Sequence, residues 1–352
     1  DRGTPLRRPE VRLMELTTFA TAIASLAVAA LPSPPGADRA GALLRADATV
    51  QPAAIRAATW RGGPQTTPAG EVVTVYVSES YEDADARAVA WARFFTTLVH
   101  GPELSTVTAY VAPAAEIGSL CGNPDAAGCY GGRRLVFVGD LGLGIPPEAV
   151  AAHEYGHHIA ASRSNTPWAA LDTGPKRWAS QVGVCARAGA STAFPGDEGA
   201  NYTLNPGEGF AETYRVLNGV RAEPDPDWPI VDPSFRPDFA ALEAARADVL
   251  EPWQAPVTQT FRARFRRGGP QRWTLRLSTR LDGDLRLELR LPAGAGYGLT
   301  LTAPGGRAMG AAARIATGRE QLDARICGER ALTVSVRRNG PPAAFRLLVT
   351  QP

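Results

Sequence analysis

The segment from Ala149 to Ser162 constrains the fold of this chain more than any other stretch of its sequence. Its sequence is AVAAHEYGHHIAAS, it follows two prolines that a first helical turn tolerates, and it predicts a helix. His153 and His157 are four residues apart, so both imidazoles lie on one face of that helix. Two imidazoles on one helix face can bind the same metal ion, and the segment therefore predicts a metal site.

Glu154 follows the first of these histidines. From this position its carboxylate can reach a metal-bound water without binding the metal itself, as a general base must. With only four histidines in the chain, an HExxH sequence would arise by chance on the order of a few times in a thousand such chains. We therefore expect Zn²⁺ as the cofactor and Glu154 as a catalytic residue. His158, by contrast, is expected to cap the helix or to face solvent.

The third zinc ligand is not part of this segment. A catalytic zinc ion binds three protein side chains and keeps a fourth position open. The extended metzincin sequence would supply a histidine at 163 after a glycine at 160, but this chain has Ala160 and Arg163 there. The metzincin class is therefore excluded, and the third ligand must come from elsewhere in the chain.

A second predicted helix offers two carboxylates. Glu208 and Glu212 are four residues apart in it, and Asn205 can cap its first turn. We assign Glu208 to the metal and Glu212 to the ring N–H of a ligating histidine, where a carboxylate orients the imidazole. The reverse assignment stays open, and Asp172, which is nearer to His157 in sequence, is the alternative ligand.

HEYGH, followed by NPGEGFAETY at 205–214, resembles the gluzincin metallopeptidases, and locally it is most similar to the lethal-factor type. The resemblance covers residues 71–250 and implies a zincin-like domain that hydrolyses peptide bonds. It implies Glu208 as the zinc ligand and, shortly before it, a tyrosine that supports the reacting carbonyl group, for which Tyr202 is the nearest candidate. Gly209 departs from the family, in which a bulky or acidic residue is common at this position.

The N-terminal region has the layout of a secretory signal. Four arginines precede an uncharged run from Leu16 to Leu31, and a Pro-rich stretch follows. These 16 residues are fewer than the ~20 mostly apolar residues of a bilayer span, which favours a cleaved signal at 1–31 over a membrane anchor. A start at Met14 would remove the arginines. We expect a secreted, extracellular protein.

The four cysteines also fit export, because disulfides persist in oxidising compartments. Cys121 and Cys129 flank a short loop, whereas Cys185 and Cys327 lie far apart in sequence. We favour a disulfide within each of these pairs, although three connectivities are open. No CxxC spacing supports a cysteine zinc site.

The chain is expected to be an α+β protein followed by an all-β domain. Residues 32–70 are rich in Pro, Ala and Gly and predict a linker or pro-segment. Predicted strands and helices place a zincin-like catalytic domain at 71–254. Short alternating runs predict a β-sandwich at 255–352, similar to the pre-peptidase C-terminal modules of secreted bacterial peptidases. The predicted strand at 133–139 precedes the HExxH helix, and we expect an extended substrate to add there as another strand.

Charge excludes one class of partner. Basic and acidic side chains number 37 and 35, so the formal net charge is +2 and nucleic-acid binding gains no support. Residues 257–352 hold 17 Arg and 6 Asp or Glu, a local excess of 17 − 6 = +11. These arginines predict the solvated faces of strands or, alternatively, attachment to an anionic cell-surface polymer.

The expected partner of the HExxH site is a peptide or protein substrate. Two other functions stay open. The zinc site could be structural or vestigial in a surface-binding protein whose Arg-rich domain carries the function. The chain could also be a zinc hydrolase of another substrate class, because HExxH specifies an activated water rather than the bond that it attacks. The sequence does not indicate an oligomeric state.

Overall fold

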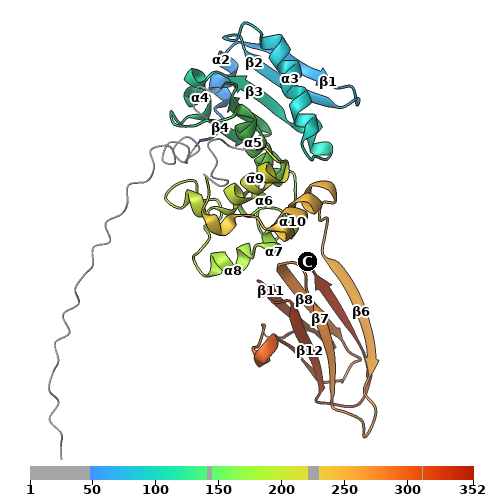
Figure 1. Cartoon of the computed structure of the whole chain (residues 1–352). Helices are drawn as coiled ribbons and strands as arrows, with labels where there is room; N and C mark the ends of the chain where they lie inside the picture. The colour runs from blue at the N-terminus through green and yellow to red at the C-terminus, as the bar shows by residue number, and fades with distance from the viewer. Residues whose placement is uncertain (1–47, 141–144, 221–229, 311) are drawn as a thin grey trace, which may run out of the picture. The chain divides into compact units, whose positions relative to one another are not determined.

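Figure 1 shows the protein as a computed structural model. The structure describes most of the chain, namely residues 48–140, 145–220, 230–310 and 312–352. The protein has a mixed α+β fold, in which helices and one sheet are followed, after Leu250, by a region of strands. The predicted signal sequence at 1–31 and the first part of the predicted linker, 32–47, lie outside the described residues.

The first sheet has five strands in the order β1-β2-β3-β5-β4. Strands β2, β3 and β5 are parallel, whereas β1 and β4 run antiparallel at the two edges. The strands are β1 (Trp60–Thr66), β2 (Val72–Ser78), β3 (Thr108–Ala112), β4 (Gly128–Gly131) and β5 (Arg134–Val138). Along β2 and β3, fully buried apolar residues alternate with half-buried Thr and Tyr, so one face of this part of the sheet packs in the core.

Two predictions about this sheet are wrong. Residues 32–70 were expected to be a linker or pro-segment, but α2 (Pro52–Ala57) and β1 are formed within them, and β1 pairs with β2 along its whole length. The predicted strand at 133–139 is β5, which lies between β3 and β4 and cannot accept a further strand. The edge of the sheet on this side is β4, whose short Gly-flanked sequence gives no strand signal.

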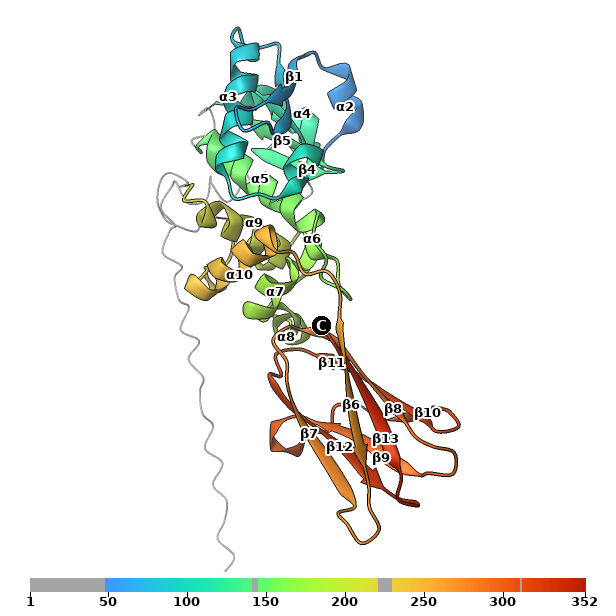
Figure 2. The ribbon, with the colours of Figure 1, turned by 90° about the vertical axis from the view of Figure 1, so that its right-hand side faces the viewer.

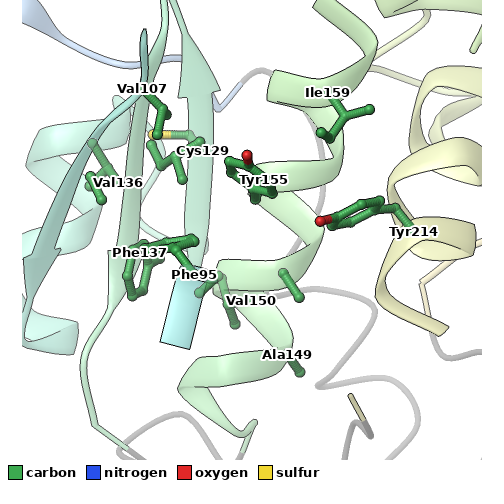
Figure 3. Close-up of a cluster of buried hydrophobic side chains, with 14 of the residues drawn as sticks. Phe95, Val107, Cys129, Val136, Phe137, Ala149, Val150, Tyr155, Ile159 and Tyr214 are labelled. Atoms are coloured by element: carbon green, nitrogen blue, oxygen red, sulfur yellow. The ribbon is translucent and has the colours of Figure 1, made fainter. Parts of the chain in front are cut away.

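Helix α5 (Pro147–Ala161) packs against β4 and β5 and carries the HExxH segment. Phe95 of α3 (Ala84–Thr97) contacts both the Phe137 ring of β5, at 6.0 Å between ring centroids, and the Tyr155 ring of α5, at 5.6 Å. Figure 3 shows these rings gathered between α5 and the sheet. Helices α3 and α5 therefore cover the same face of the sheet, and this apolar layer holds α5 in place.

Other described helices precede or follow α5 in the chain. They are η1 (Pro102–Thr106) and α4 (Ala114–Cys121), which precede α5, and α6 (Ala170–Thr173), α7 (Lys176–Gln181), α8 (Val184–Gly189), η3 (Tyr202–Leu204), α9 (Pro206–Leu217), η4 (Pro233–Phe235) and α10 (Phe239–Leu250), which follow it. Helix α9 packs on α5, and α6 and α10 pack on α9. The second predicted helix, which carries Glu208 and Glu212, is α9.

The region after Val257 forms two sheets, of five and three strands, in the orders β10-β11-β8-β13-β6 and β7-β12-β9. Figure 2 shows these strands side by side. They are β6 (Val257–Arg264), β7 (Arg272–Ser278), β8 (Gly283–Arg290), β9 (Tyr297–Thr302), β10 (Ala313–Ala316), β11 (Arg319–Ile326), β12 (Ala331–Arg338) and β13 (Ala344–Gln351). Apolar side chains from both sheets share one core cluster, while Arg276 and Arg286 are exposed as predicted.

Both predicted disulfides are present. Cys121 bonds to Cys129, which fastens the end of α4 to β4, and Cys185 bonds to Cys327, which links α8 to the segment after β11. Two disulfides are compatible with an extracellular protein. Within the described ranges, no helix is long and apolar enough to cross a membrane.

Candidate metal centre

Close contact between α5 and α9 brings the histidines of the first helix next to the carboxylates of the second. A Cβ added to Gly156 would lie 2.7 Å from the Cα of Ala211, so only glycine allows α9 to approach α5 this closely. At Gly209, a Cβ would lie 2.9 Å from the Phe235 ring. The glycine that departs from the gluzincin pattern is therefore required here by packing.

The start of α9 is capped as the sequence predicts. The Asn205 side-chain Oδ1 accepts a hydrogen bond from the Gly207 amide at 3.0 Å, and Pro206 occupies the first helical position. The same oxygen accepts a hydrogen bond from the Gly196 amide at 3.1 Å, so the cap also fixes the preceding loop. Glu208 lies in the first turn, where the helix dipole favours a carboxylate.

His153, His157 and Glu208 converge on one point. The Nε2 atoms of the two histidines are 3.2 Å apart, and the Glu208 carboxylate lies 3.0 Å from His153 Nε2 and 3.3 Å from His157 Nε2. Neighbouring ligand atoms around a tetrahedral zinc ion, with bonds of about 2.0–2.1 Å, lie about 3.3–3.4 Å apart. The three side chains are buried and could hold a metal ion.

Glu212 lies behind the ligand group, on the next turn of α9. Its Oε2 is 3.4 Å from His153 Nδ1, and Arg215 donates to the same carboxylate from Nε at 2.7 Å and from Nη2 at 3.2 Å. A proton on Nδ1 leaves the lone pair of His153 Nε2 free for a metal. Glu208 thus occupies the ligand position and Glu212 the outer one; Asp172, the alternative ligand, is not among the three converging side chains.

The carboxylates make this centre strongly favourable for positive charge. Burial by itself lowers the pKa of an imidazole, but Glu208 and Glu212 outweigh that effect and raise the pKa of His153 to about 10. Burial likewise opposes a raised pKa at His157, where Glu208 outweighs it. In return, and against the effect of its burial, the histidines hold the pKa of Glu208 well below its usual value. A metal cation can take the place of the protons held here.

Glu154 lies beside the ligands without joining them. It is 4% exposed, and no hydrogen-bond partner of its carboxylate lies within the described residues. Burial raises the pKa of Glu154 to about 7, and the Glu208 carboxylate adds to the shift, while His153 and His157 oppose it. A Cβ added to Gly128 of β4 would lie 2.9 Å from Glu154 Oε1. The carboxylate therefore faces the edge strand of the sheet and suits proton transfer near neutral pH.

Tyr202 reaches the site through a ligand. Its hydroxyl group donates a hydrogen bond of 2.7 Å to Glu208 Oε2. Burial and the neighbouring Glu208 carboxylate raise the Tyr202 pKa well above its ordinary value, so the hydroxyl group keeps its proton. In this arrangement Tyr202 orients Glu208, and it can donate to a substrate oxygen only if this hydrogen bond is exchanged.

The metal centre opens into a cavity of about 260 Å³. Besides the site residues named above, it is lined by Ala48, Thr49, Gly128, Cys129, Tyr130, Leu171, Asp172, Gly196 and Glu198. A second cavity, of about 500 Å³, shares Tyr130 and Leu171 with the first. The two cavities thus adjoin at these two residues, and we refer to them together as the depression.

His158 is a further correction. It is fully buried, with Nε2 lying 3.0 Å from the Glu103 carbonyl oxygen and Nδ1 lying 3.3 Å from the Tyr130 hydroxyl group. Tyr130 in turn stacks on the His157 ring, with 6.4 Å between centroids. The sequence carries no signal for this contact because η1 and β4, which supply the partners, are distant from α5 along the chain. His158 therefore fixes the cavity wall instead of facing solvent.

Comparison with known proteins supplies no family for this chain. No protein-family model matches the sequence, and no curated protein matches it.

Proposed function

We propose that this protein is a secreted, zinc-dependent metalloendopeptidase with a zincin-like catalytic domain of the gluzincin type. The observation that carries the proposal is the spacing of the three ligand atoms, 3.0 to 3.3 Å, with a buried carboxylate beside them. Two imidazoles and one carboxylate form a ligand set typical of catalytic zinc in peptidases. A structural zinc site would be closed by a fourth protein ligand, whereas this one faces a cavity.

The chemistry divides among the residues of the centre. When bound, zinc lowers the pKa of water and polarises a carbonyl oxygen. His153, His157 and Glu208 hold the ion, and Glu212 keeps the His153 ring oriented through its Nδ1. Glu154 accepts the proton of the attacking water and then delivers it to the leaving amine. Tyr202 holds Glu208 in place through its hydrogen bond, and once that bond is exchanged its protonated hydroxyl group can donate to the reacting carbonyl oxygen.

An extended peptide fits the wall of this cavity. Strand β4 is the edge strand of the sheet, and Gly128, Cys129 and Tyr130 of that strand line the cavity. An edge strand binds an extended peptide through main-chain hydrogen bonds. Because the adjoining cavity prolongs the depression past Tyr130 and Leu171, several substrate residues have room, which favours an endopeptidase. A proline scan of a cleaved peptide should block turnover at the positions whose N–H pairs with β4; equal turnover across the scan would contradict this binding mode.

Export and the C-terminal region complete the proposal. We propose that the two C-terminal sheets form a β-sandwich module, like those appended to secreted bacterial peptidases, and that the disulfides form outside the cytoplasm. Six of the module's arginines already form ion pairs with its own acidic residues: Arg286, Arg290, Arg307, Arg319, Arg325 and Arg330. This internal pairing weakens the case for an anionic polymer as the module's partner.

The test is cleavage of a mixed peptide library by the zinc-loaded protein, followed by mass spectrometry, with Glu154→Gln as the matched variant. Glu154→Gln preserves the ligands and the size of the side chain while removing the base, so we expect turnover to fall by about 10²–10⁴-fold. Bound zinc, measured by elemental analysis, should be unchanged. Cleavage at equal rates by both proteins would contradict the role of Glu154, and no cleavage by the parent would favour a non-peptide substrate or a binding function.

A further inference from the structure

We propose that Glu198 and Asp172 form a cation-binding subsite in the wall of the metal cavity, and that the substrate presents an ammonium or guanidinium group next to the scissile bond. This inference rests on the proposed peptidase function and names the class of substrate that the cavity takes. The two residues come from different segments, a loop and α6, and both line the cavity.

The charge of the cavity wall is one-sided. The ionisable side chains that line the cavity are two histidines, Tyr130, Tyr202 and four carboxylates. No described Lys or Arg lines it. Two of the carboxylates, Glu154 and Glu208, are assigned to the chemistry and to the metal. The other two, Asp172 and Glu198, lie outside the group of converging ligands. No described Lys or Arg balances these four carboxylates, so the wall favours a cationic ligand.

Glu198 is held in position by the cap of α9. Its Oε1 accepts a hydrogen bond of 2.8 Å from Asn205 Nδ2. Asn205 also accepts from the Gly207 and Gly196 amides, so one side chain ties the Glu198 loop to the helix that carries Glu208. The second carboxylate oxygen, Oε2, has no hydrogen-bond partner in the described part of the chain. Glu198 thus offers a fixed acceptor at the mouth of the cavity.

Asp172 approaches the same loop from α6. A Cβ added to Gly196 would lie 3.2 Å from the Asp172 Cγ atom, and Gly196 has a φ of 73°, which disfavours any other residue. No ion pair or hydrogen bond engages the Asp172 side chain within the described residues. A carboxylate without a cationic partner, which lines the same cavity as a second one, is a strong acceptor for charged donors from a ligand.

Glu154 gives independent support for a ligand in this cavity. It is 4% exposed, lines the same cavity, and has no hydrogen-bond partner in the described ranges. A buried carboxyl group without a partner is costly, and a bound molecule can supply what the protein lacks. The cavity therefore suits a polar ligand. The carboxylates of Asp172 and Glu198 favour a ligand that is positively charged.

Two sources can supply the cationic nitrogen, and peptide design separates them. One is a Lys or Arg side chain next to the scissile bond; the other is the free α-amino group of a short substrate. Peptides that differ only in Lys, norleucine or Glu at one position test the first source when both ends are blocked. The same peptides with a free amino terminus test the second.

The cleavage assay compares the zinc-loaded parent with Glu198→Gln and Asp172→Asn at pH 8, which lies above the pKa of about 7 that burial gives Glu198. Gln at 198 keeps the oxygen that accepts from Asn205, so the cap of α9 is preserved. In the parent, we expect kcat/KM to favour the cationic peptide over its norleucine counterpart by about tenfold or more. Each variant should reduce this ratio several-fold. Glu243→Gln, an exposed change on α10, is the matched control and should keep the parental ratio.

A binding assay separates failure of the subsite from failure of the peptidase proposal. Glu154→Gln retains the cavity but lacks the base, so the affinity for each blocked peptide can be measured by titration calorimetry without cleavage. Charge-dependent binding without any cleavage by the parent would support the subsite and overturn the peptidase. Cleavage or binding that is equal for Lys and norleucine, or a preference that both variants retain, would overturn the subsite. The absence of both cleavage and binding would overturn it as well.

Discussion

The metal centre and the C-terminal sheets use the same charged side chains in opposite ways. In the centre, Glu208 is 4% exposed and Glu212 is fully buried, and both contact His153. On the sheet, Arg286 and Asp323 lie 2.8 Å apart with side chains that are 62% and 56% exposed. Water screens the Arg286–Asp323 pair, which therefore contributes little to the free energy of unfolding. Burial strengthens the electrostatic interactions of Glu208 and Glu212 with His153. Burial, rather than residue type, therefore determines where charge can perform chemistry.

Removal of a buried metal ligand should have the largest effect on zinc binding and peptide cleavage. In Glu208→Ala, we expect zinc binding to be lost and peptide cleavage to fall to background, because two imidazoles alone no longer complete the site. Elemental analysis measures the bound metal, and thermal unfolding with and without zinc measures the stabilisation that a ligand brings. The exposed substitution Glu243→Ala should keep both properties. A zinc-loaded, active Glu208→Ala protein would show that another residue is the third ligand.

Acid should weaken metal binding by a large factor. The pKa of His153 is raised to about 10, so its imidazole holds a proton in the metal-free protein at neutral pH and a metal must displace it; Glu208 raises the pKa of His157 in the same direction. Lowering the pH from 8 to 6 should therefore raise the zinc Kd, by about 100-fold or more at tenfold per pH unit for each displaced proton. Titration calorimetry in buffers of different ionisation enthalpy reports both the affinity and the proton release. An affinity that is independent of pH would argue against histidine ligation.

Loss of the outer carboxylate should have a smaller effect. Glu212→Gln keeps the shape of the side chain but weakens the contact with His153 and removes the charge that faces Arg215. We expect zinc affinity to fall by about 10–100-fold. Competition with a chelator measures this change. Glu288→Gln removes a carboxylate that pairs with Arg290 on the exposed face of the sheet and should leave zinc affinity unaltered, so equal losses in the two variants would contradict a specific role for Glu212.

The smallest effect is expected on the sheet itself. Arg286→Gln breaks the exposed pair with Asp323 and should change the free energy of unfolding by less than about 1 kcal/mol. Urea denaturation measures this difference, and peptide cleavage should be unaffected. A loss of several kcal/mol would mean that the pair is less screened than its exposure indicates.

The helical parts of the site were predictable because each follows from local spacing. The four-residue interval between His153 and His157, and the same interval between Glu208 and Glu212, place side chains on one helix face regardless of the rest of the fold. Asn205 and Pro206 mark the start of α9 by capping chemistry that acts within one turn. The sequence could therefore nominate His153, His157 and Glu208 as a group that could hold a metal ion, although it left Asp172 and Glu212 open as alternative ligands.

The strands that frame the site were harder to predict. Strand β1 contains Gly62, Gly63 and Pro64, which are unfavourable in strands, yet pairing with β2 overrides this tendency. Strand β4 has only four residues, 128–131, and it forms because β5 and the Cys121 disulfide hold it. Propensity acts locally, whereas pairing depends on partners that are distant in sequence.

The sequence by itself determined which side chains are candidates for metal binding and for a general base, and which cysteines are available to pair. Only the tertiary structure decided what surrounds them. It buried His158 against η1, made β4 the edge of the sheet, and brought Asp172 and Glu198 to one cavity. The physical reason is that helix periodicity operates over a few residues, whereas the cavity wall is assembled from segments whose contacts arise only when the whole chain packs.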